Sequence, residues 1–188
     1  MSFRHTSKRF FDIFISCVGM LLTLPLLFVL LIFIRLESKG NPLFIQTRLG
    51  RDQKPFKCFK LRTMYITAPE GSSHTVPEGH ITKLGSFLRK TKLDELPQFT
   101  NVIFGDMSLV GPRPCLPSQS ELISHRHKLG VFKVRPGITG LAQVKGVGTI
   151  HAAHQASLDS KYIESFSLML DFKILIITIT GRWEDSGE

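Results

Sequence analysis

The stretch IFISCVGMLLTLPLLFVLLIFI, residues 13–34, decides the fold, because it runs for 22 residues without a charge. At about 1.5 Å per residue, a straight helix of this length reaches roughly 33 Å, enough to cross the hydrocarbon core of a bilayer. A cleaved signal peptide has a shorter apolar region that ends in small residues, whereas this stretch ends at Arg35-Leu36-Glu37. The sequence therefore predicts a membrane segment that is not cleaved.

Basic residues flank this apolar stretch on both sides. They are Arg4, Lys8 and Arg9 before it, and Arg35, Lys39, Arg48, Arg51 and Lys54 after it. Positive charge favours the cytoplasmic side of a membrane, and Pro25 removes a helix hydrogen bond and bends the axis. We therefore expect a re-entrant helix, which returns to the face that it entered; a single kinked crossing is the alternative. Asp12, at the mouth of the stretch, is expected near the lipid headgroups.

Composition narrows the class of protein. The 188 residues suffice for one domain, and 43% apolar with 21% charged residues excludes intrinsic disorder. The net charge of +9 indicates anionic partners, which are nucleic acid, anionic lipid or phosphorylated small molecules. The basic residues lack the interleaved aromatic residues of a nucleic-acid platform, so nucleic acid is not expected. Three scattered cysteines without a CxxC pair argue against a disulfide framework or a zinc site.

The rest of the chain is expected to form short elements of mixed type. Residues 43–66 alternate around a Gly-Arg-Asp turn and predict a β-hairpin or two extended pieces, and residues 67–80 predict an exposed loop. Helices are expected over 83–92, from Pro97 onward, over 117–130 and, as one or two helices, over 151–180. The glycine-rich residues 131–150 predict a loop that approaches another segment closely. The strongly apolar last helix lies either in the membrane interface or in the core.

Asp94 and Glu95 form the sharpest local feature. Adjacent carboxylates on a helix point about 100° apart, but both can reach a common metal or phosphate near a helix end. Arg89, Lys90 and Lys92 lie just upstream. Nearby cations would lower the pKa of Asp94 and keep it ionised, as a nucleophile or a Mg²⁺ ligand requires. A surface helix of mixed charge is the plainer alternative.

Several cations occupy positions that suit phosphate binding. Arg113 stands between two prolines, which restrict the backbone and aim its guanidinium, and Arg135 precedes Pro136 in a similar arrangement. Lys60 and Arg62 alternate along one face of the predicted hairpin. The alternative for Arg113 is a rigid turn with a solvated guanidinium. The alternative for Lys60 and Arg62 is a basic edge strand that prevents aggregation.

Five blocks resemble the bacterial sugar transferase family, the monotopic phosphoglycosyl transferases, and cover nearly the whole chain in order. They are Lys8-Arg9 with Asp12, PLFIQTRLGRDQKPFKCFKLRTM (42–64), GSFLRKTKLDELPQFTNVIFGDMSLVGPRP (85–114), RPGITGLAQVKG (135–146) and LDSKYIESFSLMLDFKIL (158–175). The resemblance implies transfer of a sugar-1-phosphate from a UDP-sugar to undecaprenyl phosphate, with release of UMP. It also implies Mg²⁺ and a covalent aspartyl-phosphosugar intermediate, at the first step of membrane glycoconjugate assembly.

The resemblance assigns roles to particular residues. Asp94 would attack the phosphorus next to the sugar, and Glu95 would support Asp94 or the metal; both are candidate metal ligands. The phosphate- and substrate-binding candidates are Lys60, Arg62, Arg89, Arg113, Arg135, Gln143 and Asp171, and Asp159 also falls in a family motif. Besides its substrates, the expected partners are phospholipid of the bacterial inner membrane and downstream glycosyltransferases.

The resemblance also completes the predicted architecture. The fold is expected to be α+β and mostly helical, with a re-entrant membrane helix, a small β-hairpin and interfacial amphipathic helices. Residues 1–40 would form the anchor and residues 41–188 a catalytic domain at the cytoplasmic face, in one compact unit.

The chain departs from the family pattern at two positions. Leu24 replaces a common serine before Pro25, so the hydroxyl that bonds a freed carbonyl is expected from Thr23. Val147 stands where many members have an arginine.

Two other classes of protein remain open at this point. One is a non-catalytic membrane scaffold that binds acidic lipid or partner enzymes, and it would tolerate the loss of Asp94 and Glu95. The other is a membrane-tethered nucleic-acid binder, which would show steeply salt-dependent binding to oligonucleotides.

Overall fold

The computed structural model describes residues 2–68, 78–147 and 151–181. Its helices are α1 Ser2–Glu37, α2 Lys83–Thr91, α3 Gln98–Phe104, α4 Ser120–Lys128, α5 Leu141–Val144, α6 Ala152–Glu164 and α7 Leu168–Thr180. Its strands are β1 Leu43–Leu49, β2 Pro55–Leu61, β3 Ser108–Val110 and β4 Gly137–Thr139. Short 3-10 helices are η1 Arg51–Gln53, η2 Glu78–His80, η3 Leu93–Glu95 and η4 Val131–Lys133. The mostly helical α+β class is confirmed. Most of the loop predicted over 67–80 lies outside the described residues.

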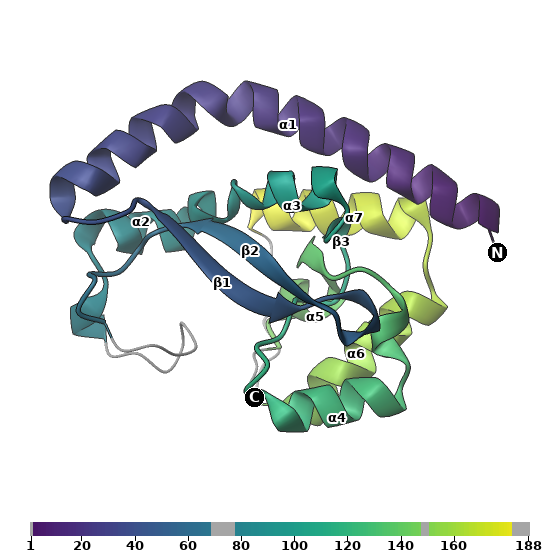
Figure 1. Cartoon of the computed structure of the whole chain (residues 1–188). Coiled ribbons are helices and arrows are strands. Elements are labelled where there is room, and N and C mark those ends of the chain that lie inside the picture. Colours follow the sequence, from purple (N-terminus) through teal and green to yellow (C-terminus); the bar gives the residue numbers. More distant parts are fainter. Residues whose placement is uncertain (1, 69–77, 148–150, 182–188) are drawn as a thin grey trace.

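Helix α1 is continuous over its 36 residues and bends near its middle, so that it arches over the rest of the molecule (Figure 1). Pro25 has no N–H, which leaves the carbonyl of Leu21 without its helical donor. The Thr23 hydroxyl donates instead to the carbonyl of Gly19 at 2.7 Å, a local bond that also bends helices. The predicted bend is confirmed, but Thr23 does not bond the carbonyl that the proline frees.

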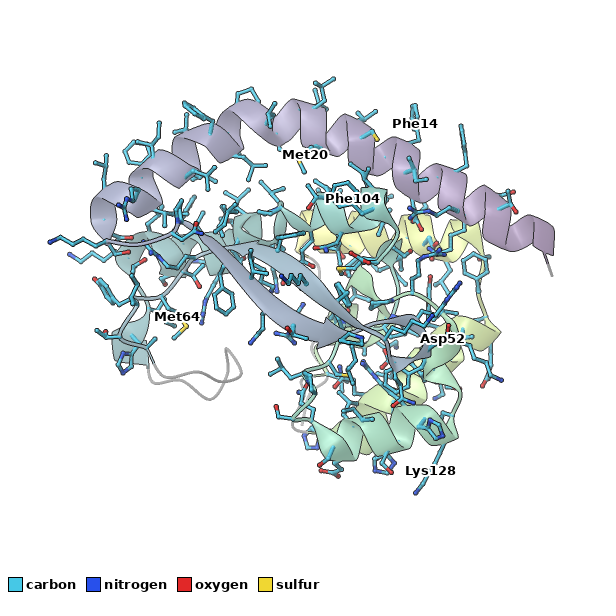
Figure 2. All side chains as sticks on the ribbon, viewed as in Figure 1. Phe14, Met20, Asp52, Met64, Phe104 and Lys128 are labelled. Carbon is cyan, nitrogen blue, oxygen red and sulfur yellow. The ribbon has the colours of Figure 1, made fainter. Side chains whose placement is uncertain are left out.

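The two faces of α1 have different surroundings. A narrow stripe is buried against the domain and includes Asp12, Ser16, Leu27, Leu30 and Ile34. The outer face, on which Figure 2 shows Phe14, carries exposed apolar side chains: Phe10, Phe14, Val18, Leu21, Leu22, Leu24, Leu26, Phe28, Val29, Ile32, Phe33 and Leu36. The segment Thr6–Glu37 is long and apolar enough to cross a membrane. An apolar surface of this extent fits membrane association.

Asp12 lies on the buried stripe, so its side chain contacts the protein interior, and its expected depth near the headgroups stays a prediction. Its side chain accepts hydrogen bonds from the Ser108 hydroxyl at 2.8 Å and from the Leu109 N–H at 3.3 Å. These donors come from β3 and compensate for the loss of water around the carboxylate. The polar part of the stripe therefore joins α1 to the core sheet.

Polar side chains bind both ends of α1 to the domain. Near the N-terminal end, Lys8 Nζ lies 2.6 Å from Asp171 Oδ2 on α7. At the C-terminal end, the Arg62 guanidinium donates to the carbonyls of Ser38 at 2.6 Å and Lys39 at 3.0 Å. Because both ends are bonded to the same unit, the arch of α1 is part of the fold.

The predicted hairpin over residues 43–66 is confirmed as the antiparallel pair β1–β2, with Leu43 opposite Leu61 and Leu49 opposite Pro55. The turn passes through η1, where Asp52 and Gln53 have positive φ values of 56° and 57°. This left-handed conformation lets two residues reverse the chain direction.

The glycine-rich residues 131–150 do not form one loop, as predicted, but contain η4, β4 and α5, with 148–150 outside the described residues. Strand β4 pairs in parallel with β3, and Ser108 lies opposite Gly137. A Cβ on Gly137 would collide with the backbone of Gly111. The predicted close approach is therefore confirmed, although strands of three residues carry too little alternation to be recognised in the sequence.

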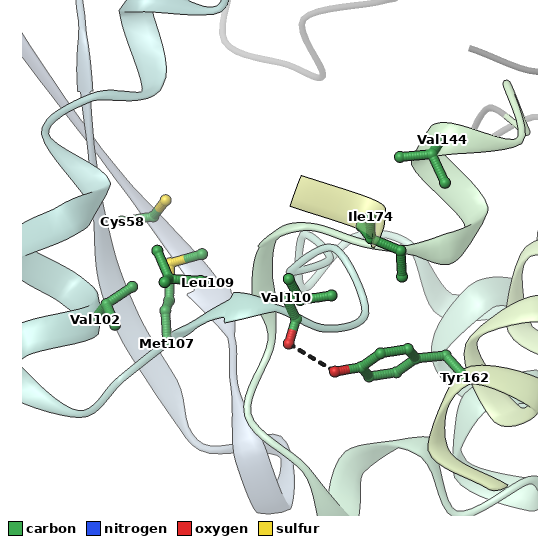
Figure 3. Packing of buried hydrophobic residues seen from close by; sticks show 8 residues of the cluster. All are labelled: Cys58, Val102, Met107, Leu109, Val110, Val144, Tyr162 and Ile174. Carbon is green, nitrogen blue, oxygen red and sulfur yellow. Dashed lines mark hydrogen bonds between the residues drawn. The ribbon is translucent and has the colours of Figure 1, made fainter. Parts of the chain in front are cut away.

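The main core lies under α1 and surrounds β3. It contains Cys58, Val102, Met107, Leu109, Val110, Val144, Tyr162 and Ile174. Figure 3 shows Tyr162, whose hydroxyl donates to the carbonyl of Val110 at 3.1 Å. The two helices over 151–180 contribute Tyr162 and Ile174, which confirms that this region is helical. Helix α7 buries Asp171 and Ile174 but exposes Met169, Phe172 and Ile179, so it has both a core face and an apolar outer face.

Candidate active site

The Asp94–Glu95 pair lies on η3, directly after α2. Lys92 ends α2 with a φ of 61°, and its N–H donates to the carbonyl of Arg89. This left-handed residue turns the chain before the pair, at a position where a non-glycine residue is strained. As a result, Asp94 and Glu95 are both buried, at 8% exposure each. A surface helix of mixed charge, the plainer alternative for this pair, is thereby excluded.

Glu95 is held by two cations from distant parts of the chain. Its Oε1 atom lies 2.7 Å from Lys60 Nζ on β2 and 2.9 Å from Arg113 Nη2. Burial alone would raise the pKa of Glu95, but the charges of Arg113 and Lys60 outweigh it and hold the pKa well below its usual range. Glu95 is therefore an anion that keeps two cations in place.

Asp94 has a different electrostatic environment. Burial raises the pKa of Asp94 and the neighbouring Glu95 adds to the effect, while Lys60, Arg113 and Arg89 only partly oppose it. The prediction that nearby cations lower this pKa is thus wrong, because desolvation outweighs them. A carboxylate that water does not stabilise is a stronger nucleophile than an exposed one.

Arg113 is positioned by its backbone as well as by Glu95. It lies between Pro112 and Pro114, as predicted, and Arg126 Nη1 donates to its carbonyl at 2.7 Å. Arg126 is itself held by Asp159, with Nη2 2.7 Å from Oδ2 and both side chains 2% exposed. Asp159, which falls in a family motif, is therefore linked to Arg113 through Arg126, a residue that no sequence motif singled out.

Lys60 and Arg89 reach the site from β2 and α2. Asn101, on α3, accepts from the Phe59 N–H at 3.1 Å and donates to the Lys57 carbonyl at 2.7 Å. These bonds replace a strand partner and fix β2 where Lys60 meets Glu95. Arg89 Nε donates to the Thr63 hydroxyl at 2.9 Å. Burial lowers the pKa of Arg89 and the Asp94 charge opposes this, which indicates that the two side chains are near one another.

Four other candidates are bonded elsewhere in the fold. Arg62 binds the end of α1, Arg135 Nε donates to the Gly105 carbonyl at 2.7 Å, and Gln143 Nε2 donates to the Ile138 carbonyl at 3.0 Å. Asp171 accepts from Lys8 and from the Tyr162 hydroxyl. Within the described part of the chain, none of the four has a hydrogen bond or ion pair with Asp94 or Glu95. The structure therefore brings together Lys60, Arg89 and Arg113 but not these four.

A small pocket adjoins Lys60 and Arg113. Its lining residues are Arg48, Cys58, Lys60, Gln98, Arg113 and Pro114. Sequence reasoning missed Arg48 and Gln98. Gln98 belongs to the LDELPQ block, so the block offered a signal, whereas Arg48 was one of several cations on the hairpin.

The carboxylate pair fits the way in which Mg²⁺ binds to phosphate-handling proteins. This ion usually takes one or two carboxylates and completes its shell with water and substrate phosphates. Among the described residues, no group of three or more side chains forms a closed metal cage. Glu95 Oε1 is occupied by Lys60 and Arg113, so its Oε2 atom and the Asp94 carboxylate are the available ligands.

The fold combines a long apolar helix, which fits membrane association, with a buried pair of carboxylates. Two adjacent buried carboxylates, Asp94 and Glu95, lie among cations from other parts of the chain. The sequence model of the bacterial sugar transferase family matches residues 3–184. The chain belongs to this family.

Three named relatives are similar to this chain over nearly all of its length. The chain is 40% identical over 183 residues to the UDP-glucose:undecaprenyl-phosphate glucose-1-phosphate transferase of Klebsiella pneumoniae, covering 92% of this chain and 39% of that protein. It is 39% identical to a transferase of the same name from Caulobacter vibrioides, covering 92% and 68% respectively. It is 36% identical to the exopolysaccharide production protein PSS of Rhizobium leguminosarum bv. phaseoli, covering 93% and 94%. The chain thus spans about two fifths of the Klebsiella relative.

Proposed function

We propose that this protein transfers a sugar-1-phosphate from a UDP-sugar to undecaprenyl phosphate and releases UMP. The observation that carries the proposal is the buried Asp94–Glu95 pair, in which Lys60 and Arg113 neutralise Glu95 while burial raises the pKa of Asp94. This division leaves one carboxylate as a fixed anion and the other as the reacting group. UDP-glucose is the first donor to test, because the Klebsiella and Caulobacter relatives are named for it.

In the first half-reaction, a carboxylate oxygen of Asp94 attacks the phosphorus next to the sugar. The new bond joins that oxygen to phosphorus, and the bond from phosphorus to the bridging oxygen breaks. Its electron pair leaves with UMP. Lys60, Arg89 and Arg113 stabilise the charge that spreads over the phosphoryl oxygens, which is the main requirement of phosphoryl transfer.

In the second half-reaction, an oxygen of undecaprenyl phosphate attacks the same phosphorus and displaces the Asp94 carboxylate. The product is an undecaprenyl diphospho-sugar, and Asp94 returns to its starting form. A covalent intermediate suits two substrates of which one is soluble and the other stays in the bilayer, because the two need not be bound together.

Asp94 and the free Oε2 atom of Glu95 would hold Mg²⁺ in this proposal. A divalent cation neutralises phosphate charge and orients the group that is transferred. The residues of the chain then position the carboxylate for in-line attack and exclude water from it.

Helix α1 would hold the site at the cytoplasmic face of the bacterial inner membrane as a re-entrant anchor. Three features support this topology: the bend at Pro25, the apolar outer face, and the bonds that join both ends of α1 to one domain. A helix that spans the bilayer would have to break the bonds at one end. The exposed apolar side chains of α7 would lie in the interface, which favours the interfacial alternative for this helix. Inner-membrane phospholipid is therefore a proposed partner, and downstream glycosyltransferases remain expected ones.

The test measures UMP release from a panel of UDP-sugars in the presence of undecaprenyl phosphate and Mg²⁺. Wild-type protein in membrane mimetic should release UMP from one preferred donor, and Asp94→Asn should release none while it still associates with membrane. Equal release by both proteins would contradict the assignment of Asp94. No release by well-folded wild type would favour the non-catalytic scaffold.

A further inference from the structure

The pocket beside Lys60 and Arg113 contains a buried hydrogen-bond donor to which the proposed function assigns no role. We call it the Gln98 pocket; its lining residues are Arg48, Cys58, Lys60, Gln98, Arg113 and Pro114. Gln98 is 3% exposed, and its Nε2 atom has no hydrogen-bond partner among the described residues. A buried amide N–H₂ without an acceptor is costly, and such groups are rare in folded proteins. The donor therefore points to an acceptor that the described part of the chain does not provide.

The charges around the pocket indicate the chemistry of that acceptor. Three of the lining residues are cations, and none is a carboxylate, among the residues that the structure describes. Lys60 and Arg113 share the single charge of Glu95. Within the described residues, Arg48 bonds to neutral groups, the Gln46 side chain at 2.6 Å and the Pro114 carbonyl at 3.0 Å. Positive charge is thus in excess beside the carboxylate pair, which favours a phosphate oxygen as the ligand.

In-line displacement relates the positions of the two phosphates that flank the reacting phosphorus in turn. The group that leaves phosphorus must lie opposite the attacking Asp94 oxygen, and in the second half-reaction the attacking group must also lie opposite Asp94. The phosphate of UMP and the phosphate of the polyprenyl acceptor therefore use the same side of the reacting phosphorus, one after the other. Both are phosphate monoesters, so one set of donors fits both.

We propose that Gln98 and Arg48, together with Lys60 and Arg113, form one phosphate-monoester site that holds the leaving UMP phosphate and then the phosphate of the polyprenyl acceptor. The inference rests on the proposed function and extends it to two residues that no motif assigned to the reaction. Gln98 donates from Nε2 to a phosphate oxygen, and Arg48 balances its charge. The site is vacated and filled again within each catalytic cycle.

Gln98→Glu tests the inference, because a carboxylate at this position pairs with the cations and occupies the site that the phosphate needs. We expect the dissociation constant of UMP, measured by calorimetry on the full chain in membrane mimetic, to rise by about tenfold or more. The KM of undecaprenyl phosphate should rise by a similar factor. Gln53→Glu places the same charge on the turn of the hairpin, where Gln53 is half-buried and contacts His127, and should leave both values unchanged.

Gln98→Met is the second variant, in case the new charge prevents folding. It keeps the length of the side chain and removes the donor, so both values should rise by about threefold to tenfold. Unchanged UMP binding in both folded variants would overturn the proposal. Weaker UMP binding with an unchanged KM for the acceptor would show a site for the nucleotide alone, and would overturn the shared use. If the wild type neither binds UMP nor turns over substrate, the proposed function fails instead. Inorganic phosphate then serves as the probe of the Gln98 pocket. Equal phosphate binding by wild type and Gln98→Glu would show that the pocket is not an anion site.

Discussion

Replacing Asp159 with Asn removes the only carboxylate that pairs with Arg126 among the described residues. In the wild type, Arg126 donates to Asp159 Oδ2 through Nε at 2.9 Å and Nη2 at 2.7 Å, and through Nη1 to the carbonyl of Arg113. Both ends of the pair are 2% exposed. The substitution keeps the shape of the side chain but leaves the guanidinium charge in the interior without a counter-ion.

The cost follows from this burial. Breaking a buried ion pair by removing one partner costs about 3–5 kcal/mol, and the retained amide oxygen places Asp159→Asn near the lower end. For a chain of this size, each kcal/mol corresponds to about 2–4 °C in melting temperature. We therefore expect the apparent melting temperature to fall by about 6–12 °C. UMP release should fall as well, because Arg126 no longer fixes the backbone of Arg113.

Thermal unfolding of the purified protein in one membrane mimetic measures this effect, and Asp52→Asn is the matched control. Asp52 pairs with Arg51 at 3.5 Å on the hairpin turn, where the two side chains are 58% and 50% exposed. Removing a charge there should change the free energy of unfolding by less than about 0.5 kcal/mol. If Asp159→Asn has the same melting temperature as Asp52→Asn, the Arg126–Asp159 pair does not stabilise the fold around Arg113.

Three further predictions concern the anchor, the metal and the carboxylate pair. Pro25→Ala restores the helix hydrogen bond to Leu21 and should favour a spanning topology, so that a cysteine in place of Ser2 becomes reactive from the periplasm; an unchanged cytoplasmic label would count against this role of the bend. Chelation of divalent cations should abolish UMP release and added Mg²⁺ should restore it, whereas activity that survives chelation would exclude the proposed metal. Glu95→Gln removes the anion that holds Lys60 and Arg113 and should lower UMP release by about a hundredfold or more; near-normal rates would refute that role.

The elements with strong sequence signals were predictable. The uncharged run around Pro25 gave the bent helix α1, and the alternation around Gly50 gave the hairpin. The helix before Asp94 follows from ordinary helix-forming residues, with Thr82 as its N-cap accepting from the Gly85 N–H. These features depend on interactions between residues that are close in the sequence, so they can be predicted from the sequence alone.

The elements that depend on distant partners were not predictable. Strands β3 and β4 are three residues each and exist because they pair with one another across a connection of 26 residues. Asp12 and Arg62 were expected near lipid and phosphate, but they bind Ser108 and the end of α1. The sequence shows that a side chain is charged, but it does not show which distant residue the side chain will contact. The partners of Asp12 and Arg62 are therefore visible only in the structure.

The electrostatics of the site were predictable only in part. The proximity of cations to the carboxylate pair was predicted correctly, but these cations lower the pKa of Glu95 and not that of Asp94, for which the effect was predicted. Asp94 differs because its pKa reflects burial, and burial at the turn after Lys92 depends on how β2 and Arg113 close over η3. Gln98 was hidden for the same reason, since an unpaired amide is recognised only when its surroundings are known.

The most direct test of the account is the intact mass of the protein after incubation with its UDP-sugar and Mg²⁺ in the absence of acceptor. The account predicts a mass gain of one sugar phosphate, located on the peptide that contains Asp94, absent in Asp94→Asn and lost when undecaprenyl phosphate is added. A wild type that turns over with acceptor present, yet never gains this mass, would contradict the covalent role of Asp94 and would indicate direct transfer between the two substrates.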